Sequence, residues 1–504
     1  MQVAPVAAPV VNLPPSRKES RNREHLASEP SRRSAPRSRR VSAADAQLTL
    51  TFGDPRTPPL TVQATVRELS YRDLSFHSKV PVAAWKIGAV LSGVQIRKSG
   101  RLAVTVDLEI RSALASLGGG SVCGARVVPG SHRASSLWTK LALSQVNPQT
   151  DVGSRFDREV WELYAESGYF NLSGKSVEDF VDTRGALAYS SDCLERDPGL
   201  GYRVVWSKDE KVHASVSIVR PYARTWLGHQ MAKSKKNPLD RADSMFALRS
   251  LYERAFEPRD DAGDADWLLG YCEAHVRWMR AAHFDFATRH QDSGKACVVP
   301  FQLLEARCDG TWHKDDETEV RVADERDVAR LLQVISATRP LAYREALDLV
   351  PERFDLGDVK RDWQAAGLER DRRVLIARRG GVDVAAAVVE VAERGINMFN
   401  ILDSVRLFAL GPAAADVRQQ AFRALLGTSA GIYGAEGRET FVYYCEEKNR
   451  AHADGLRDLG EGYTWIVAGE LTQAFLDHVR ALTEQRPSER LAEEAPRMAT
   501  GTHG

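Results

Sequence analysis

The chain has 504 residues, 43% of them hydrophobic, and this length exceeds what one hydrophobic core organises, so we expect several domains. Lys and Arg number 69 against 68 Asp and Glu, a balance that gives no global attraction toward a nucleic-acid polymer or an acidic membrane. The six cysteines show neither a C-x-x-C pair nor metal-ligand spacing, so we expect no disulfide framework and no metal site.

The two ends of the chain differ in composition from the rest. Residues 1–44 are rich in Pro, Ser, Ala and Arg and predict a disordered basic arm, and residues 486–504 predict a disordered tail. The apolar start MQVAPVAAPVVNLPP is interrupted by proline and follows no positive region, unlike a signal peptide. No apolar stretch approaches the length that spans a bilayer. We therefore expect a cytoplasmic protein without a membrane span.

Residues 45–148 alternate short β-branched runs with turns such as GDPRTPP and RKSG. This spacing predicts a small antiparallel β-barrel or β-sandwich, with a short closing helix at SSLWTKLAL. The expected strands are QLTLTF, LTVQATVREL, GAVLSGVQI, RLAVTVDLEI and SVCGARVV.

Residues 155–312 predict a second unit with the order α, β-meander, α, β. REVWELYAESGYF is expected to be a helix and YRVVWSKDEKVHASVSIVR two strands around a charged turn. Two helical segments, SMFALRSLYERAF and ADWLLGYCEAHVRWMRAAH, then precede the strand KACVVPFQLLEA.

Residues 316–485 repeat this order. Val328, Leu331, Leu332 and Ile335 have the i, i+3, i+4, i+7 spacing of one buried helical face. RRVLIARRGGVDVAAAVVEVA predicts a hairpin that turns at two consecutive glycines, Gly380 and Gly381. The remaining elements are expected to be strands in NMFNILDSVRLFAL and ETFVYYC, a glycine-capped helix in DVRQQAFRALLG, and a helix, a turn and a final strand in NRAHADGLRDLGEGYTWIVAG.

A candidate nucleotide site combines the arm with the end of the second barrel strand. Arg33 and Arg37 stand four apart in RSAPR, and guanidinium groups both stack on bases and bind phosphates with paired hydrogen bonds. The segment VRELSYRDLSF supplies Glu68, Ser70, Asp73 and Ser75 around a bend. The alternative interpretation is a solubilising basic tail followed by ordinary turn chemistry.

These segments resemble the PilZ domain, a six-stranded barrel family that binds cyclic di-GMP. The family pattern is R-x-x-x-R followed by Asp or Asn, x, Ser, x, x, Gly. By this resemblance, Arg33 and Arg37 would clamp the phosphates and stack on guanine.

The second part of that pattern fits in two registers. ELSYRD keeps Ser70 but has Glu68 for Asp and Asp73 for Gly, whereas DLSFHS keeps Asp73 and Ser75 and has Ser78 for Gly. We prefer the first register because the following LSF then continues as a strand. In both registers a β-carbon replaces the glycine at a close approach to an anion, so the sequence leaves open whether binding survives.

The order of elements in the two later units resembles the GNAT acyltransferase fold, whose members bind acyl-CoA. The family's glycine-rich pyrophosphate loop has no good counterpart in GPAAADVRQQ or RPYARTWLGHQMAK. Glu390 could act as a general base and Tyr463 as a general acid, but we favour the interpretation that they are a surface strand residue and a core aromatic. His275, His283 and His290 are seven or eight apart, a spacing unlike that of paired metal ligands. We assign no catalytic residue.

These observations lead to the hypothesis of a cytoplasmic signalling protein in which cyclic di-GMP is a regulatory ligand of the PilZ-like barrel. Binding would order the arm and alter contacts with two GNAT-like output domains and an unidentified downstream protein, a regulatory rather than an enzymatic role. Two alternatives stay open. One is an acyl-CoA-dependent N-acyltransferase with a degenerate regulatory barrel, and the other is a non-catalytic interaction scaffold.

Overall fold

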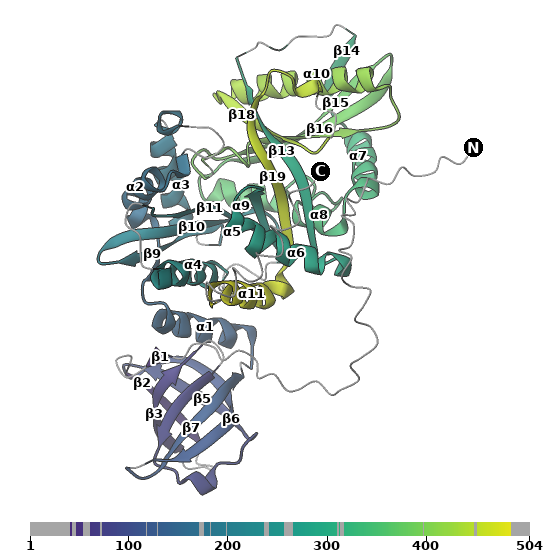
Figure 1. Ribbon diagram of the computed structural model, residues 1–504. Helices are drawn as coiled ribbons and strands as arrows, with labels where there is room; N and C mark the ends of the chain where they lie inside the picture. The colour runs from purple at the N-terminus through teal and green to yellow at the C-terminus, as the bar shows by residue number, and fades with distance from the viewer. Residues whose placement is uncertain are drawn as a thin grey trace, which may run out of the picture. The chain divides into compact units, whose positions relative to one another are not determined.

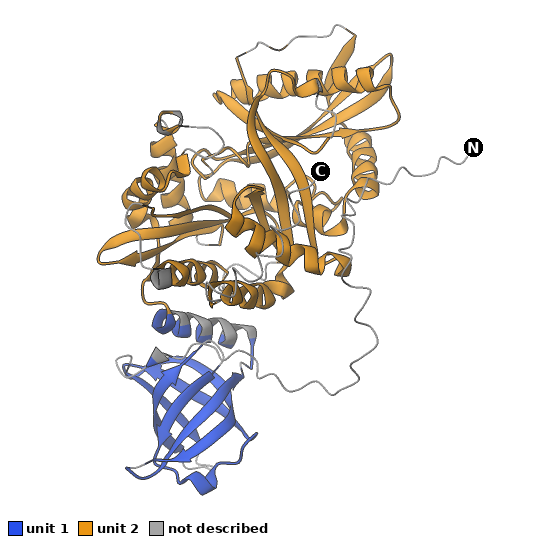
Figure 2. Ribbon diagram, viewed as in Figure 1, with its two compact units in different colours: residues 1–146 blue, residues 147–504 orange. Residues whose placement is uncertain are grey.

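The computed structural model describes residues 41–42, 47–53, 61–70, 73–116, 118–128, 130–170, 176–181, 183–197, 199–235, 241–256, 266–309, 312, 317–396, 398–447 and 451–484. Arg33 and Arg37 lie outside these residues. The chain divides into two units, residues 1–146 and 147–504 (Figure 2).

Unit 1 is a closed antiparallel barrel of six strands. The strand order is β3-β2-β5-β6-β7-β4, and β4 pairs back onto β3 to close the barrel. Its elements are β2 (Leu48–Gly53), β3 (Thr61–Leu69), β4 (Asp73–Ser78), β5 (Val90–Lys98), β6 (Arg101–Ala115), β7 (Ser121–Val128) and the helix α1 (His132–Val146). The sequence predicted this barrel and most of its strands.

The barrel interior is filled by inward-facing apolar side chains from every strand. Phe52, Phe76 and Trp85 pack with ring centroids 5.7–5.8 Å apart at its centre. A two-residue strand, β1 (Val41–Ser42), adds to the outer edge of β3. Its pairing places the residues that follow the basic arm beside the end of β3.

Unit 2 contains two halves of similar element order. The first half comprises β8 (Thr150–Val152), α2 (Asp157–Ser167), α3 (Thr183–Arg196), β9 (Gly201–Lys208), β10 (Lys211–Tyr222), β11 (Thr225–Lys233), α4 (Arg241–Ala255), β12 (Trp267–Glu273), α5 (Arg277–Met279), α6 (Asp285–His290) and β13 (Ala296–Arg307). The second half comprises β14 (Thr318–Val322), α7 (Glu325–Thr338), α8 (Leu341–Ala346), α9 (Gly357–Ala365), β15 (Arg370–Arg379), β16 (Val382–Ala392), β17 (Ser404–Ala409), α10 (Ala415–Ala435), β18 (Thr440–Cys445), β19 (Arg457–Ala468) and α11 (Thr472–Glu484).

The two halves share one mixed sheet of 12 strands in the order β14-β15-β16-β17-β18-β13-β19-β12-β11-β10-β9-β8. The last strand of each half, β13 in the first and β19 in the second, pairs with a strand of the other half. β13 pairs with β18 of the second half, β19 pairs with β12 of the first half, and the two strands pair with each other along their length (Figure 1). The sequence predicted two separate units of this kind; the structure joins them into a single sheet by exchanging strands.

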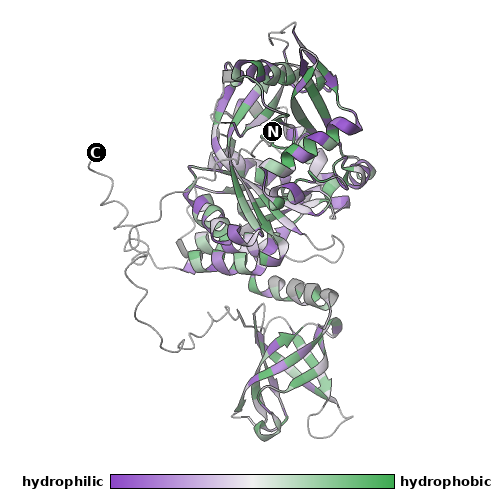
Figure 3. Cartoon of the chain, turned by 90° about the vertical axis from the view of Figure 1, so that its right-hand side faces the viewer, coloured by the Kyte–Doolittle hydropathy of each residue, from purple (hydrophilic) through white to green (hydrophobic). Residues whose placement is uncertain are grey.

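Helices cover both faces of the first half of the sheet. Buried residues of α4, α6 and α11 form one core with β9, β10 and β12, while α2 and α3 form another core on the opposite face. Figure 3 shows hydrophobic stretches along the strands of both units, with hydrophilic and hydrophobic residues mixed along the helices. None of the described helices combines the length and the apolar character needed to cross a membrane.

Two local predictions in unit 2 are wrong. The segment predicted as a helix at residues 265–283 begins with strand β12, because WLLGYC is a short apolar run buried on both faces, where helical and strand patterns look alike. The helix predicted to end at Gly427 continues to Ala435. Gly427 is a packing glycine, since a β-carbon there would lie 3.1 Å from Cβ of Trp312.

The exchanged strand provides a test of the fold. A β-carbon on Gly462 of β19 would lie 2.9 Å from the carbonyl oxygen of Cys272 on β12 and 2.7 Å from the ring of Phe301 on β13. We expect Gly462→Ala to lower the free energy of unfolding by about 1–3 kcal/mol in urea denaturation, since neither strand can move away. Gly431→Ala is the control, because Gly431 of α10 faces open space and alanine favours the helix. Equal midpoints for the two variants would contradict the strand exchange.

Candidate functional site

The parallel strands β11 and β12 form a fork. They pair from Thr225 and Trp267 to Gly228 and Gly270, and beyond these glycines the two strands are no longer paired with each other. Both residues at the apex of the fork lack side chains. A β-carbon on Gly228 would find its nearest neighbours at 3.6 and 3.8 Å, an ordinary contact distance, so the apex has spare room.

Beyond the apex, β11 carries a β-bulge. Ser217 of β10 pairs with His229 and Ser215 pairs with Ala232, so Gln230 and Met231 together face a single residue. Gln230 has a positive φ of 52°. Its side chain accepts a hydrogen bond from the Ser217 hydroxyl (3.0 Å) and donates one to the Ile396 carbonyl of the second half (3.2 Å). The bulge is therefore held in place, and bulges of this kind redirect backbone groups beside active sites.

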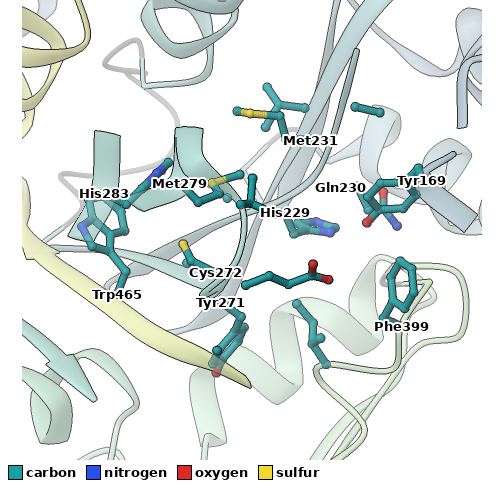
Figure 4. Close-up of a pocket in the computed structure, with 18 of the residues that line it drawn as sticks. Tyr169, His229, Gln230, Met231, Tyr271, Cys272, Met279, His283, Phe399 and Trp465 are labelled. Carbon is teal, nitrogen blue, oxygen red and sulfur yellow. The ribbon is translucent and has the colours of Figure 1, made fainter. Parts of the chain in front are cut away.

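A cavity of about 460 Å³ occupies the fork (Figure 4). His283 and Trp465 lie at one end of it and Tyr169 and Phe399 at the other. Consecutive residues of β12, Tyr271 and Cys272, both line it although their side chains project to opposite faces of the sheet. The cavity therefore passes through the sheet, which the separation of the two strands makes possible.

Charged groups lie where the fork widens. Lys233, the last residue of β11, donates a hydrogen bond to Ser244 in the first turn of α4, and Lys235 follows it. The helix α4 begins six residues after Lys235 in sequence order, at Arg241, and the positive end of a helix favours an anion. On the other strand, Glu273 has its Oε2 3.3 Å from Nε2 of His275. The cavity thus has cations at the end of one strand and a carboxylate at the end of the other.

The buried titratable groups that line the cavity are neutral at neutral pH. Burial lowers the pKa of both His229 and His283 to about 3. Burial, with a smaller contribution from Glu273, raises the pKa of the Cys272 thiol well above its usual value, which argues against a thiolate nucleophile. Among the described residues no group of three or more His, Cys, Asp or Glu is placed to hold a metal ion.

The corresponding fork of the second half is filled. β17 and β18 pair at Ser404–Val442 and Val405–Tyr443, so the residues nearest the apex are large. Arg406 of β17 lies 4.5 Å from the ring centroid of Tyr444 on β18 and occupies the space between the strands. β16 and β17 pair in continuous register, so β17 has no bulge like that of β11. Only the first of these two described forks is open at its apex.

Neither of the two residues considered for catalysis lies at the cavity. Glu390 is 1% exposed, and its carboxylate accepts hydrogen bonds from Arg370 (2.6 Å) and Arg372 (2.7 Å). Burial alone would raise the pKa of this carboxyl, but the surrounding arginines outweigh burial and hold the pKa far below its usual range. Glu390 is a buried structural anion, so both the general-base role and the surface-residue alternative are wrong. Tyr463 is 4% exposed in the core, and burial raises the pKa of its hydroxyl.

In unit 1 the residues predicted to bind a nucleotide surround the β3–β4 turn. Ser70 is fully buried, its amide donates to the Asp73 carbonyl (2.8 Å), and its hydroxyl oxygen accepts from the Asp73 amide (3.1 Å). Glu68 pairs across the strands with Ser75, and Ser42 of β1 pairs with Glu68 on its other side. Arg33 and Arg37 lie outside the described residues, so their position relative to this turn stays a prediction.

Comparison with known proteins gives structural likeness alone. No protein-family model and no curated protein sequence matches the chain. The structural neighbours include a tandem GNAT protein from the clavulanic acid biosynthesis pathway, with a TM-score of 0.34 and 10% identity over 64% of this chain and 98% of that protein. They also include a GCN5-related N-acetyltransferase from Sphaerobacter thermophilus, with a TM-score of 0.33 and 10% identity over 64% of this chain and 96% of that protein.

A further structural neighbour is the complex of MrkH from K. pneumonia with c-di-GMP, with a TM-score of 0.20 and 14% identity. It covers 22% of this chain and 52% of that protein. The neighbours thus include GNAT-type acetyltransferases, but at these scores the likeness assigns neither a substrate nor a ligand to this chain.

The sequence does contain an indication of the open fork, namely two glycines within strands. Neither the composition nor the known motifs point to them. Gly228 and Gly270 are isolated glycines inside the apolar strands TWLGHQ and WLLGYC. A glycine within a strand weakens it and often marks the place where a ligand or another backbone approaches closely. Which two glycines meet depends on strand pairing, which local patterns do not reveal.

The buried histidines predict the pH dependence of stability. The unfolded chain takes up a proton on each histidine near pH 6.5, whereas the folded chain keeps His229 and His283 neutral down to about pH 3. Stability is therefore fully present above pH 6.5 and decreases as the pH falls toward 3, by about 2 kcal/mol per histidine at pH 5.

Urea denaturation at pH 7.5 and pH 5 measures this effect. We expect His283→Phe to lose less stability between the two values than the unchanged protein. His275→Gln is the control, because this side chain is 73% exposed. An equal loss in His283→Phe and in the unchanged protein would show that His283 is not a buried neutral group.

Proposed function

We propose that unit 2 binds a CoA thioester in the fork between β11 and β12 and transfers its acyl group to an amine. The observation that carries this proposal is the open fork, in which a cavity of about 460 Å³ runs through the sheet from cationic residues to an apolar interior. The volume falls in the range of small-molecule sites, about 300–1,000 Å³.

The shape and polarity of the fork suit a long, thin ligand with an anionic end. Lys233, Lys235 and the N-terminus of α4 offer positive charge for phosphate groups in place of a glycine-rich loop. Beyond Gly228 and Gly270, the backbone groups on the facing edges of β11 and β12 do not hydrogen-bond from one strand to the other. Such edges can pair with the amides of an extended ligand as they would with a strand.

The chemistry needs a base and a donor to the carbonyl oxygen. The acceptor nitrogen attacks the thioester carbonyl, the carbon–nitrogen bond forms, the carbon–sulfur bond breaks and CoA leaves as the thiol after taking up a proton. Glu273 is a carboxylate that lines the cavity and can accept the proton that the amine loses. The bulge at Gln230 turns backbone amides out of the β10 ladder, and such amides can stabilise negative charge on the carbonyl oxygen.

Filling the apex of the fork tests this proposal. We expect Gly228→Leu to weaken the binding of acetyl-CoA at least about tenfold in calorimetric titration, because the new side chain occupies the passage between the strands. The added β-carbon meets no atom closer than 3.6 Å, and urea denaturation of Gly228→Leu checks that the variant is folded.

Gly431→Leu is the matched control, because Gly431 faces open space on α10. It should bind acetyl-CoA as the unchanged protein does. Binding by Gly228→Leu at the unchanged affinity would place the ligand elsewhere. If CoA, acetyl-CoA and longer-chain acyl-CoA all gave no heat with the unchanged protein, the acyltransferase function would be rejected and a scaffold role favoured.

A second candidate function concerns the barrel, and β1 is the observation that favours it. Val41 pairs with Leu69 and Ser42 with Glu68, directly beside the turn formed by Ser70 and Asp73. Arg37 is four residues before Val41, so the chain allows its backbone to reach at most about 14 Å from that point. We propose that Arg33 and Arg37 close over a cyclic di-GMP held at this turn.

The clamp is tested by titrating cyclic di-GMP into an Arg33→Ala, Arg37→Ala double variant. Each lost guanidinium removes charge-assisted hydrogen bonds to phosphate, so we expect affinity to fall at least about tenfold. Arg17→Ala with Arg21→Ala is the control, because these residues have the same spacing in the sequence but stand farther from β1. Equal binding by the two double variants would exclude the clamp, and no binding by the unchanged protein would exclude the ligand.

A further inference from the structure

The part of the cavity that lies on the α2 side of the sheet forms a distinct chamber. We call it the far chamber, and it is lined by Tyr169, Phe301, Leu303, Phe399, Ile401 and Tyr444. Phe399, Ile401 and Tyr444 come from the second half, and Tyr169 follows α2 of the first half. The far chamber therefore exists only because the two halves share one sheet.

Most of the wall of the far chamber is apolar, although Glu273 lines the same cavity on the Tyr271 face of β12 and lies close enough to Tyr169 to raise the pKa of its hydroxyl further, beyond the larger effect of burial. The Tyr444 hydroxyl donates to the Ile401 carbonyl (3.0 Å), so its polar atom is used within the wall. The hydroxyl of Tyr271, beside the chamber, accepts a hydrogen bond from Arg406 (2.8 Å). The rings of Tyr271 and Tyr444 stack with centroids 4.9 Å apart, and Phe301 meets the Tyr444 ring edge-on at 4.9 Å. A ligand in the chamber would meet mainly rings and aliphatic groups, with the Glu273 carboxylate on the same face of the sheet.

The far chamber and the cationic residues are on opposite faces of the sheet. Lys233 contacts Ser244 of α4, and Cys272 and Trp465 belong to the core that α4 forms. Phe301, Tyr444 and Leu459 belong to a core on the other face. The apex of the fork lies between the two faces, and its two residues, Gly228 and Gly270, have no side chains. A ligand anchored by its phosphates beside α4 would send its other end through the fork into the far chamber.

We propose that the far chamber holds the acyl chain of the donor, so that the donor is a CoA thioester whose chain is longer than acetyl and apolar. This inference rests on the proposed function of the fork. An acetyl group would end near the fork and leave the apolar walls beyond it without a partner. Each methylene buried there contributes a factor of about four to the affinity.

Calorimetric titration of the full chain with CoA, acetyl-CoA and octanoyl-CoA measures the effect of chain length. We expect octanoyl-CoA to bind at least about 100-fold more tightly than acetyl-CoA, because several methylenes enter the far chamber. If CoA and both thioesters bound with equal affinity, the acyl-chain inference would be rejected while the proposed CoA site remained. If none of the three bound, the proposed function itself would fail.

Two substitutions of Ile401 test whether the acyl chain binds in the far chamber. Ile401→Trp should reduce the affinity for octanoyl-CoA to about that for acetyl-CoA, because the indole fills the chamber. Ile401→Ala should shift the preference toward dodecanoyl-CoA, because the chamber is larger. Neither change removes the carbonyl that accepts from Tyr444.

Leu341→Trp is the matched control, because Leu341 on α8 is 55% exposed and does not line the cavity. It adds an indole to the protein without filling the chamber, and it should keep the octanoyl preference. Loss of that preference in Leu341→Trp as well, or its retention in Ile401→Trp when that variant is folded by circular dichroism, would overturn the assignment of the far chamber.

Discussion

The antiparallel pairing of β13 with β19 is the constraint on which the rest of unit 2 depends. Each strand closes the half that it does not follow in sequence, because β13 pairs with β18 and β19 pairs with β12. Neither half can complete its sheet alone, and the centre of the 12-stranded sheet consists of the two exchanged strands. Backbone hydrogen bonds between the two halves therefore hold the strands beside the fork in place. The cavity at the boundary between the halves is lined by residues of both halves.

The two halves share an element order but differ at their forks. The first half keeps an open fork, with Gly228 and Gly270 at its apex and a bulge beyond it. In the second half Val405 and Tyr443 stand nearest the apex, and the stacked Arg406 and Tyr444 fill the space. The same Tyr444 then lines the far chamber of the first half. A side chain that fills one fork thus also lines the cavity of the other.

Local patterns in the sequence were enough for much of the fold but not for the site. The barrel strands and the hairpin at Gly380 and Gly381 followed from alternation and turn residues, since these elements are specified by neighbours in the chain. The apolar run at β12 looked helical because burial on both faces removes the alternation that marks a strand. The pairing of Gly228 with Gly270 and the exchange of β13 and β19 depend on contacts between distant segments, which periodicity does not encode. Glu390 was a candidate general base because the sequence alone shows an isolated acidic residue in an apolar strand. Its two arginine partners are known only from the structure.

The buried charges around Glu390 show how the alignment of the halves is fixed away from the exchanged strands. Tyr222 of β10 donates to the Glu390 carboxylate (2.9 Å), and Arg370 donates both to that carboxylate and to the Pro221 carbonyl of the first half. A buried ion pair adds little net stability over an apolar replacement, yet removing one member costs about 3–5 kcal/mol. Moving one half relative to the other would break this cluster, and the free-energy cost of breaking it is larger than the net stability that the cluster adds to the fold. Because the far chamber lies between the halves, this restriction preserves its shape.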